Sequence, residues 1–379
     1  MITNHIARKV GVTVQQRINH LGVGEKMQDL PEELWHKSFR FYVREDPTRQ
    51  GGPNLRMIRL DPTKPSLTVT GYIFNKFVHP TENRFITVRE AARLQGFPDE
   101  LTFEGTLTST QQQVGNAVPI PLAKAVFASV LQNAITLGFN SHALTAFSLF
   151  CGAGGLDIGA EQGRQKNLHI HTKVSLDNWS DACKTLQGYY GDRAHIICRD
   201  ITTIENPVQC WQTLSGETNT PDLVYGGPPC QAFSQAGKQR GTTDERGNLI
   251  AEFLRFIKAL RPAFFVMENV SNLKGVESGT LYKQILDQIE DLGYNLTVDT
   301  LLAADFGAPQ LRRRILFLGC RKDIGHLSLP TPTHSESPTL FDQLYTTVGE
   351  AFQGLPEARY NGDVVPLRAL ENVSEAIPA

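Results

Sequence analysis

The sequence predicts an α/β protein with a mostly parallel sheet, helices on both faces, and a small irregular second region. Between about residues 144 and 322, short apolar runs alternate with stretches of helical periodicity, which is typical of parallel strands joined by crossover helices. A glycine-rich turn follows the first of these apolar runs. By contrast, residues 20–66 are rich in Gly, Pro and charge, and residues 323–379 are Pro-rich and irregular.

The individual elements follow from apolar runs and their spacing. Strands are expected at 144–150, 173–176, 195–197, 222–225, 264–267 and 315–318. Helices are expected at 88–94, 120–137, 152–163, 248–260 and 281–292. In the fourth helix the apolar residues share one face, which should be buried: Phe253, Phe256, Ile257 and Leu260.

Length and composition restrict the class of protein. A chain of 379 residues suits one large catalytic domain plus a smaller module, and 40% hydrophobic with 20% charged residues is ordinary for a soluble protein. We find neither an apolar run of about 18 residues nor a secretory signal, so a cytoplasmic location without a membrane span is expected. The six cysteines form no C-x-x-C pair, which argues against zinc and for free thiols. No metal is expected.

Charge is unevenly distributed along the chain. The net charge is −2, yet residues 1–60 carry ten Lys or Arg against six Asp or Glu. Residues 323–379 carry two Arg against eight acids. Any contact with nucleic acid must therefore use local basic patches, and solvated surface explains both ends equally well.

The first strand leads into the run Cys151-Gly152-Ala153-Gly154-Gly155 and then a helix. Glycines let a ligand approach the backbone, and the start of a helix offers free N–H groups. Asp177 ends the next strand, where it suits ribose hydroxyls, and Asp200 ends the third, where it could face an adenine amino group. From these residues alone the ligand could be NAD, FAD or S-adenosylmethionine, and a tight packing turn is the alternative.

A second set of reactive groups follows. Cys230 comes directly after Pro228-Pro229 at the end of a strand, where α/β folds place reactive residues. Glu268 ends the buried run 264–267, and burial would raise its pKa so that it could donate a proton. Gln310, Arg312 and Arg314 alternate, so an extended segment would place them on one face.

Together these motifs resemble the DNA (cytosine-5) methyltransferases of bacterial restriction-modification systems, over roughly residues 56–322. The similarity covers 147–155, Pro228-Pro229-Cys230-Gln231, Glu268-Asn269-Val270, Gln310-x-Arg312-x-Arg314, 84–98 and Gly115-Asn116-Ala117-Val118-Pro119. It implies a Rossmann-like, S-adenosylmethionine-dependent methyltransferase fold, with S-adenosylhomocysteine as product. The motifs at 84–98 and 115–119 normally come last in the family but here come first, so the chain looks circularly permuted.

The permuted order implies a domain organisation. A catalytic domain is expected at 59–322, with the late motifs in 59–137 and the cofactor and catalytic motifs in 144–322. Target recognition would be assembled from both ends of the chain, 1–58 and 323–379. This is physically reasonable because domain termini often lie close together at the surface.

The resemblance also implies roles for individual residues. Cys230 would attack C6 of the cytosine, Glu268 would protonate N3, Arg312 would hold the base, and Arg314 would contact or support it. Asn269 would hold the turn. The residues expected around the cofactor are Phe147, Gly152, Gly154, Gly155, Asp177, Asn178, Asp200, Ile201, Pro229 and Asn116.

The substrate implied is double-stranded DNA with the target cytosine flipped out of the helix. The loop 231–247 is expected to close on the DNA, with contacts from Gln231, Ser234, Lys238, Arg240 and Arg246. A monomer paired functionally with a restriction endonuclease is expected. Two alternatives remain open: a tRNA cytosine-5 methyltransferase, although its usual Cys-Phe-Thr tripeptide is absent, and a DNA-binding relative without activity.

Overall fold

The computed structural model describes residues 2–45, 57–71, 76–139, 141–229 and 249–360. The described chain divides into two compact units. Unit 1 comprises the described residues within Met1–Thr3, Asp61–Tyr72 and Ala91–Gln353. Unit 2 comprises those within Asn4–Leu60, Ile73–Glu90 and Gly354–Ala379. These bounds differ from the expected ones: described residues of 73–90 lie in unit 2, and 323–353 lie in unit 1.

Local pairing explains where these two segments lie. In unit 2, β4 (Phe77–Val78) pairs in parallel with β2 (Ile58–Arg59). In unit 1, the backbone N–H of Thr333 donates to the carbonyl of Asp305, and the Tyr345 hydroxyl donates to Asp305 Oδ1 at 2.7 Å. Hydrogen bonds between segments that are distant in the sequence therefore decide where each unit ends.

Unit 1 is built on an eight-stranded sheet. Its order is β11 (Tyr294–Leu302), β13 (Arg313–Arg321), β10 (Phe264–Val270), β9 (Leu223–Gly226), β5 (Ala143–Leu149), β7 (Leu168–Asp177) and β6 (Arg164–Gln165), with β8 (His195–Cys198) also paired to β7. Strands β10, β9, β5, β7 and β8 run in parallel. Strand β13 is antiparallel to its neighbours β10 and β11, and β6 is antiparallel to β7. The predicted α/β fold with a mostly parallel sheet is confirmed.

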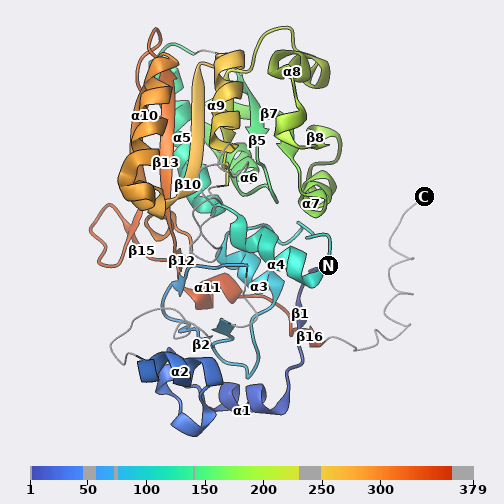
Figure 1. Ribbon diagram of the computed structural model, residues 1–379, viewed down its shortest axis with the longest axis vertical. Helices are drawn as coiled ribbons and strands as arrows, with labels where there is room; N and C mark the ends of the chain where they lie inside the picture. Colours follow the sequence, from blue (N-terminus) through green and yellow to red (C-terminus); the bar gives the residue numbers. More distant parts are fainter. Residues whose placement is uncertain (1, 46–56, 72–75, 140, 230–248, 361–379) are drawn as a thin grey trace, which may run out of the picture. The chain divides into compact units, whose positions relative to one another are not determined.

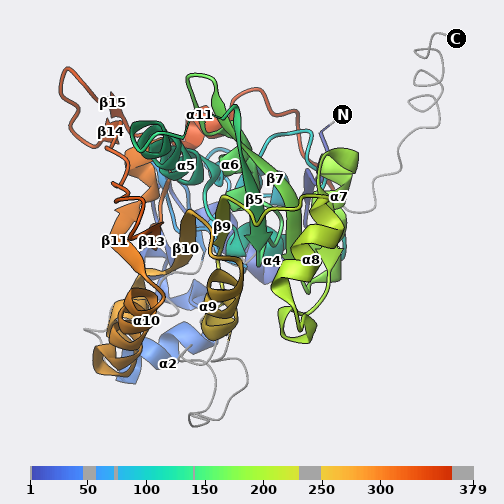
Figure 2. The same cartoon turned by 90° about the horizontal axis from the view of Figure 1, so that it is seen from above.

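Helices cover both faces of this sheet (Figure 1, Figure 2). Helices α5 (Ile120–Thr136) and α6 (Gly155–Gln162) pack on one face, and α8 (Pro207–Ser215), α9 (Leu249–Leu260) and α10 (Thr280–Asp291) on the other. Strand β5 serves both cores, with Leu144 and Ala146 in the first and Phe147 and Leu149 in the second. The predicted apolar face of 248–260 is buried as expected.

The remaining elements of unit 1 are short. They are β3 (Ser66–Leu67), α4 (Leu107–Asn116), α7 (Ser180–Tyr190), β12 (Gln310–Leu311), β14 (His334–Ser335), β15 (Gln343–Leu344) and α11 (Val348–Phe352), with 3-10 turns at Gly191–Arg193, Ile201–Thr203, Ser271–Gly279 and Ala303–Phe306. Helix α3 (Val88–Leu94) spans the division between the units. Helices α4, α7 and α8 had not been predicted; α4 and α8 begin at side-chain caps, from Thr106 and Asn206.

Among the described residues, the stretch Leu107–Thr136 is long and apolar enough to cross a membrane by length and composition alone. However, 67% of its most apolar window is buried inside the protein. Within this stretch, α5 is a core helix that packs on the sheet and on α6.

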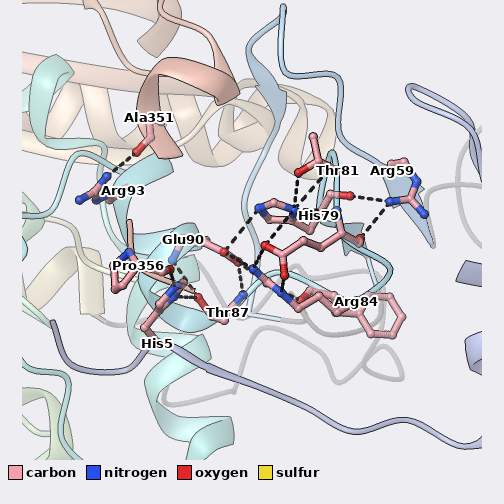
Figure 3. Close-up of polar contacts among 12 residues, drawn as sticks. His5, Arg59, His79, Thr81, Arg84, Thr87, Glu90, Arg93, Ala351 and Pro356 are labelled. Atoms are coloured by element: carbon pink, nitrogen blue, oxygen red, sulfur yellow. Dashed lines mark hydrogen bonds and ion pairs between the residues drawn. The ribbon is translucent and has the colours of Figure 1, made fainter. Parts of the chain in front are cut away.

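Unit 2 has little regular structure. It contains β1 (Ile6–Ala7), α1 (Val12–His20), α2 (Lys37–Glu45), β2, β4 and β16 (Arg359–Tyr360), with 3-10 turns at Met27–Asp29 and Glu32–Leu34. The buried Arg59 guanidinium donates to the carbonyls of Ile18 and Leu21 at 2.8 and 2.7 Å. It also donates to the carbonyl of His79 at 2.8 Å (Figure 3). The Arg59 donors thus bond carbonyls of three separate positions, of which that of Ile18 also accepts the N–H of Leu21 at 3.3 Å.

The two ends of the described chain meet within unit 2. Strands β1 and β16 pair in parallel, with Ile6 opposite Arg359 and Ala7 opposite Tyr360. His5 is buried and bonds through Nδ1 to Thr87 Oγ1 at 2.9 Å and through Nε2 to the carbonyl of Pro356 at 2.8 Å (Figure 3). The first and last described segments therefore lie side by side.

Candidate functional site in unit 1

A cavity of about 520 Å³ lies at the carboxyl ends of strands β5, β7, β8, β9 and β10. The strand order reverses between β5 and β9, which is where open α/β sheets bind ligands. Eleven predicted site residues line this cavity: Asn116, Gly152, Gly155, Asp177, Asn178, Asp200, Ile201, Pro229, Glu268, Arg312 and Arg314. The sequence motifs of both halves are thus brought to one place.

The glycine turn after β5 has the expected strand, turn and helix geometry. Gly152 and Gly154 have positive φ values of 52° and 87°, and Gly154 is the N-cap of α6. A Cβ at Gly155 would lie only 2.5 Å from the carbonyl oxygen of Val118. Gly154 is not among the residues that line the cavity; its contribution is the left-handed conformation that starts the helix.

Phe147 is placed differently from the expectation. Its side chain is fully buried in the core beneath the cavity, where its ring packs against Trp211 and Phe256 with centroids 5.7 and 5.9 Å apart. Strand alternation points residues 147 and 149 into that core. Phe150, at the end of the strand with φ of 55°, lines the cavity instead.

Asp177 braces the backbone around the cavity. Its Oδ2 accepts from the N–H of Gly152 and its Oδ1 from the N–H of Trp179, each at 2.8 Å. Burial raises the pKa of Asp177, and these backbone hydrogen bonds oppose the rise. The neighbouring Asn178 is exposed and also lines the cavity, so its amide is the more available polar group.

Asp200 follows β8 and caps the short turn Ile201–Thr203. Its Oδ1 accepts from the N–H and the hydroxyl of Thr202 at 2.9 and 2.8 Å. Arg199 beside it donates to Thr203 Oγ1 at 2.9 Å and lines the cavity as well. These hydrogen bonds fix the backbone that presents Ile201.

The turn after β9 is shaped by close packing. A Cβ at Gly227 would lie 2.8 Å from Glu268 Oε2, so only glycine leaves room for that carboxylate. Asn269 Nδ2 donates to the carbonyl of Pro228 at 3.0 Å, which confirms its predicted role in holding the turn. Cys230, Gln231, Ser234, Lys238, Arg240 and Arg246 lie outside the described residues.

Glu268 and Arg314 form a partly enclosed ion pair. Glu268 Oε1 lies 2.6 Å from Arg314 Nε, and both side chains are almost buried. Burial raises the pKa of Glu268, while the positive charges of Arg314 and Arg312 oppose the rise. The outcome is a pKa above the ordinary value, as the sequence analysis expected, so this carboxyl group can hold a proton more readily than a free one.

Arg312 has a different environment from Arg314. Its Nη1 donates to the carbonyl of Val69 at 2.6 Å and its Nη2 to that of Gly115 at 2.9 Å. Among the described residues, its buried Nε has no hydrogen-bond partner. Burial and then repulsion by Arg314 lower the pKa of Arg312. The segment is extended as predicted, with Gln310 and Arg312 buried and Leu311 exposed between them.

Comparison with known proteins identifies the family to which this site belongs. The family model for C-5 cytosine-specific DNA methylases matches residues 6–132 and 144–367. The chain belongs to this family.

The relatives of this methylase include characterised bacterial proteins. It is 39% identical over 218 residues to the Type II methyltransferase M1.HphI of Haemophilus parahaemolyticus, covering 56% of this chain and 53% of the relative. It is 34% identical over 247 residues to the Type II methyltransferase M.NgoFVII of Neisseria gonorrhoeae, covering 63% and 62%. The chain thus spans about half to three fifths of the length of these relatives.

The chain is 26% identical to a protein of solved structure, a putative DNA modification methyltransferase encoded within an Escherichia coli prophage. The structural alignment covers 56% of this chain and 56% of the other, with a TM-score of 0.46.

Several residues lining the methylase cavity were not predicted from the sequence. They include Phe150, Trp179, Arg199 and Leu176. Phe150 could have been found from its position as the last residue before the glycine turn, where its partly buried side chain packs against the second core and also lines the cavity. A metal ion is usually held by several His, Cys, Asp or Glu side chains. The described part of the chain contains no group of three or more such side chains that could hold an ion.

Proposed function

We propose that this methylase transfers a methyl group from S-adenosylmethionine to C5 of a cytosine in a short, specific sequence of double-stranded DNA. One observation carries the proposal: a single cavity is lined by the glycine turn, the Glu268–Arg314 pair and the Pro228-Pro229 turn that precedes Cys230. One cavity wall thereby combines a candidate donor site, a candidate acid and Pro229, the residue that directly precedes the candidate nucleophile in the sequence.

The cavity fits the proposed methyl donor. Its volume of about 520 Å³ falls in the range of small-molecule sites. Phe150, Trp179 and Ile201 offer apolar surface for a flat adenine, and Asn178 and Asp200 offer polar groups for the nucleoside. When bound, S-adenosylmethionine supplies an electrophilic methyl group. The tight packing of Gly155 on Val118 keeps the wall of the site close to the ligand.

The chain's own residues would make C5 reactive. Attack of the Cys230 thiolate on C6 makes the ring electron-rich at C5. Glu268, with its raised pKa, donates a proton to N3 as the cysteine adds. Loss of the C5 proton and expulsion of Cys230 then restore the aromatic ring.

The geometry refines the roles of the two arginines. Arg312 donates hydrogen bonds to the carbonyls of Val69 and Gly115. We therefore assign Arg312 a positioning role, in which it holds the wall of the site. Arg314 pairs with Glu268, and its side chain lines the cavity and is 12% exposed, whereas Arg312 is only 1% exposed, so Arg314 is better placed to contact the base. This reverses the emphasis that the sequence alone placed on Arg312.

We further propose that the DNA target is read by unit 2 in a circularly permuted chain. The pairing of β1 with β16 and the bonds of His5 support this, because they bring the two ends together as the permuted motif order requires. The flipped cytosine would enter the cavity, and loop 231–247 would close on DNA phosphates. We also propose that the enzyme is a cytoplasmic monomer that protects DNA from a partner endonuclease; the Type II methyltransferase names of the relatives fit a restriction-modification role.

Expression of the chain in a methylation-free bacterial host tests this function. Sequencing the host DNA with a 5-methylcytosine readout should reveal methylation in one short motif, and Cys230→Ser should abolish it. Methylation that persists in Cys230→Ser would overturn the assignment of the nucleophile. Methylated tRNA together with unmodified DNA would show that the chain is a tRNA cytosine-5 methyltransferase. Sequence-specific DNA binding without methylation would show that it is a DNA-binding relative without activity.

A further inference from the structure

Two cysteine side chains meet against one turn of the cavity wall. Cys183 lies on α7, and its Sγ is 3.6 Å from the carbonyl oxygen of Asp177 and 3.9 Å from that of Ile197. Cys198 ends β8, opposite Asp177 in the strand register, and its Sγ is 3.9 Å from the carbonyl oxygen of Asn178. Both thiols therefore contact the backbone of residues 177–178 from different elements.

The two thiols differ in accessibility. Cys198 is exposed, whereas Cys183 is only 5% exposed. Burial, and then the neighbouring Cys198 thiol, raise the pKa of Cys183. A small oxidant can thus reach Cys198 first. The raised pKa of Cys183 keeps little of this thiol as thiolate, so its attack on the oxidised Cys198 is the slow step.

Both cysteines are joined to residues that line the cavity. The N–H of Cys183 donates to the carbonyl of Trp179 at 2.9 Å, and the N–H of Arg199, next to Cys198, donates to the carbonyl of Asp177 at 2.8 Å. Residues 177–179 and 199–201 all line the cavity. A disulfide holds its two sulfurs about 2 Å apart, so bonding two thiols that contact this wall from different elements would shift it.

We propose that Cys198 and Cys183 are an oxidative modification site, which closes to a disulfide and weakens binding in the adjacent cavity. The second part rests on the proposed function, which assigns that cavity to the methyl donor. Intracellular disulfides are commonly transient and redox-sensing, which fits a pair placed beside a ligand site.

The chemistry is a thiol–disulfide exchange with a small disulfide such as oxidised glutathione. The Cys198 thiolate attacks one sulfur of the small disulfide and releases one small thiolate, leaving a mixed disulfide. Cys183 loses its proton and attacks Sγ of Cys198, releasing the second small thiolate. The protein pair loses two electrons and two protons, and the small disulfide is reduced to two thiols.

The test uses the full chain carrying Cys230→Ser, so that the candidate nucleophile cannot react. After treatment with oxidised glutathione, peptide mass spectrometry without reduction should show Cys183 linked to Cys198. Affinity for S-adenosylhomocysteine, measured by calorimetry, should fall about tenfold on oxidation and recover with dithiothreitol. Adding Cys198→Ser should abolish both effects.

A matched control is Cys210→Ser, which removes a half-buried thiol on α8 and should change neither result. Because Cys183→Ala alters a buried position, it serves only to confirm the link. Glutathione that stays on Cys198 without a bond to Cys183 would overturn the pair. Unchanged affinity in the linked protein would overturn its effect on the cavity. If the reduced protein fails to bind S-adenosylhomocysteine while the link forms, the donor proposal fails and the thiol pair stands.

Discussion

Arg314 Nε lies 2.6 Å from Glu268 Oε1, and both groups line the cavity of unit 1. Strands β10 and β13 bring them together, because their antiparallel register places Val270 opposite Arg314 and Glu268 opposite Leu316. The pair combines an acid whose pKa is raised by burial with a cation that limits the rise. Its geometry separates the roles of two arginines that are two residues apart in the sequence.

The two arginines should respond differently to replacement. Arg314→Ala should lower the methylation rate about 100-fold with little change in stability, because a charged partner of Glu268 is lost from the site. Arg312→Ala should cost about 3 kcal/mol of unfolding free energy, because two buried carbonyls lose their donor. Methyl-transfer assays and urea unfolding of both variants measure this. Full stability in Arg312→Ala would contradict the positioning role.

Gly227→Ala should impair catalysis through Glu268. The added Cβ would lie 2.8 Å from Glu268 Oε2, so the carboxylate must move from its place beside Arg314. We expect a loss of about tenfold or more in kcat. Gly188→Ala is the matched control, since a Cβ there meets nothing within 4 Å. Equal activity of the two variants in a steady-state assay would show that Glu268 tolerates displacement.

Asp157 makes unfolding depend on pH. Burial raises the pKa of this carboxyl group, in the first turn of α6, from 3.8 to about 6, although the Ser175 hydroxyl donates to it at 2.8 Å. The folded state therefore favours the protonated acid. Its stabilising contribution is complete below the unfolded pKa and is lost as pH rises from about 4 to about 6, by about 3 kcal/mol at most.

Asp157→Asn should remove this pH dependence. The difference in unfolding free energy between variant and parent should move in favour of the variant as pH rises across that window. Urea titrations at pH 5 and pH 7 give the comparison. Asp323→Asn is the control, because pairing with Arg321 lowers the pKa of exposed Asp323, so its contribution changes only below about pH 4 and its difference should stay flat between pH 5 and pH 7. A flat difference for Asp157→Asn would refute the burial argument.

Relinking the chain tests the proposed circular permutation. A variant that starts at Ser141, with residue 379 joined to residue 1 and ending at residue 140, restores the usual family order of motifs. It should fold and methylate the same DNA sequence, because β1 and β16 already pair and the cut falls between α5 and β5. Circular dichroism and sequencing of host DNA provide the readout. A second variant, cut between Val224 and Tyr225 inside β9, should fail to fold.

The positive charges of loop 231–247 should govern how the affinity for DNA depends on salt concentration. If Lys238 and Arg240 contact phosphates, replacing both with Ala should weaken DNA binding and lower the slope of log affinity against log salt by about two. Fluorescence anisotropy at several salt concentrations measures the slope. Lys258→Ala, on α9, is a control of equal sign outside the loop. An unchanged slope in the double variant would place the loop away from the DNA.

The fold class and most of the cavity could be predicted from the sequence. Apolar runs of regular spacing predicted six strands of the sheet because buried parallel strands need side chains that are apolar on both faces. Glycines, prolines and charged residues at strand ends predicted Gly152, Glu268 and Pro229 at the site, since the carboxyl ends of parallel strands meet at one edge.

Which of two nearby residues reaches the cavity or the ion pair depends on tertiary contacts. Phe150 rather than Phe147 lines the cavity, and Arg314 rather than Arg312 pairs with Glu268. Asp177 and Asn178 both line the cavity, but the Asp177 carboxylate already accepts from two backbone N–H groups. Such choices depend on which hydrogen-bond partners are already taken. Contacts such as that between Arg312 and Val69 join segments more than two hundred residues apart, which no local pattern contains.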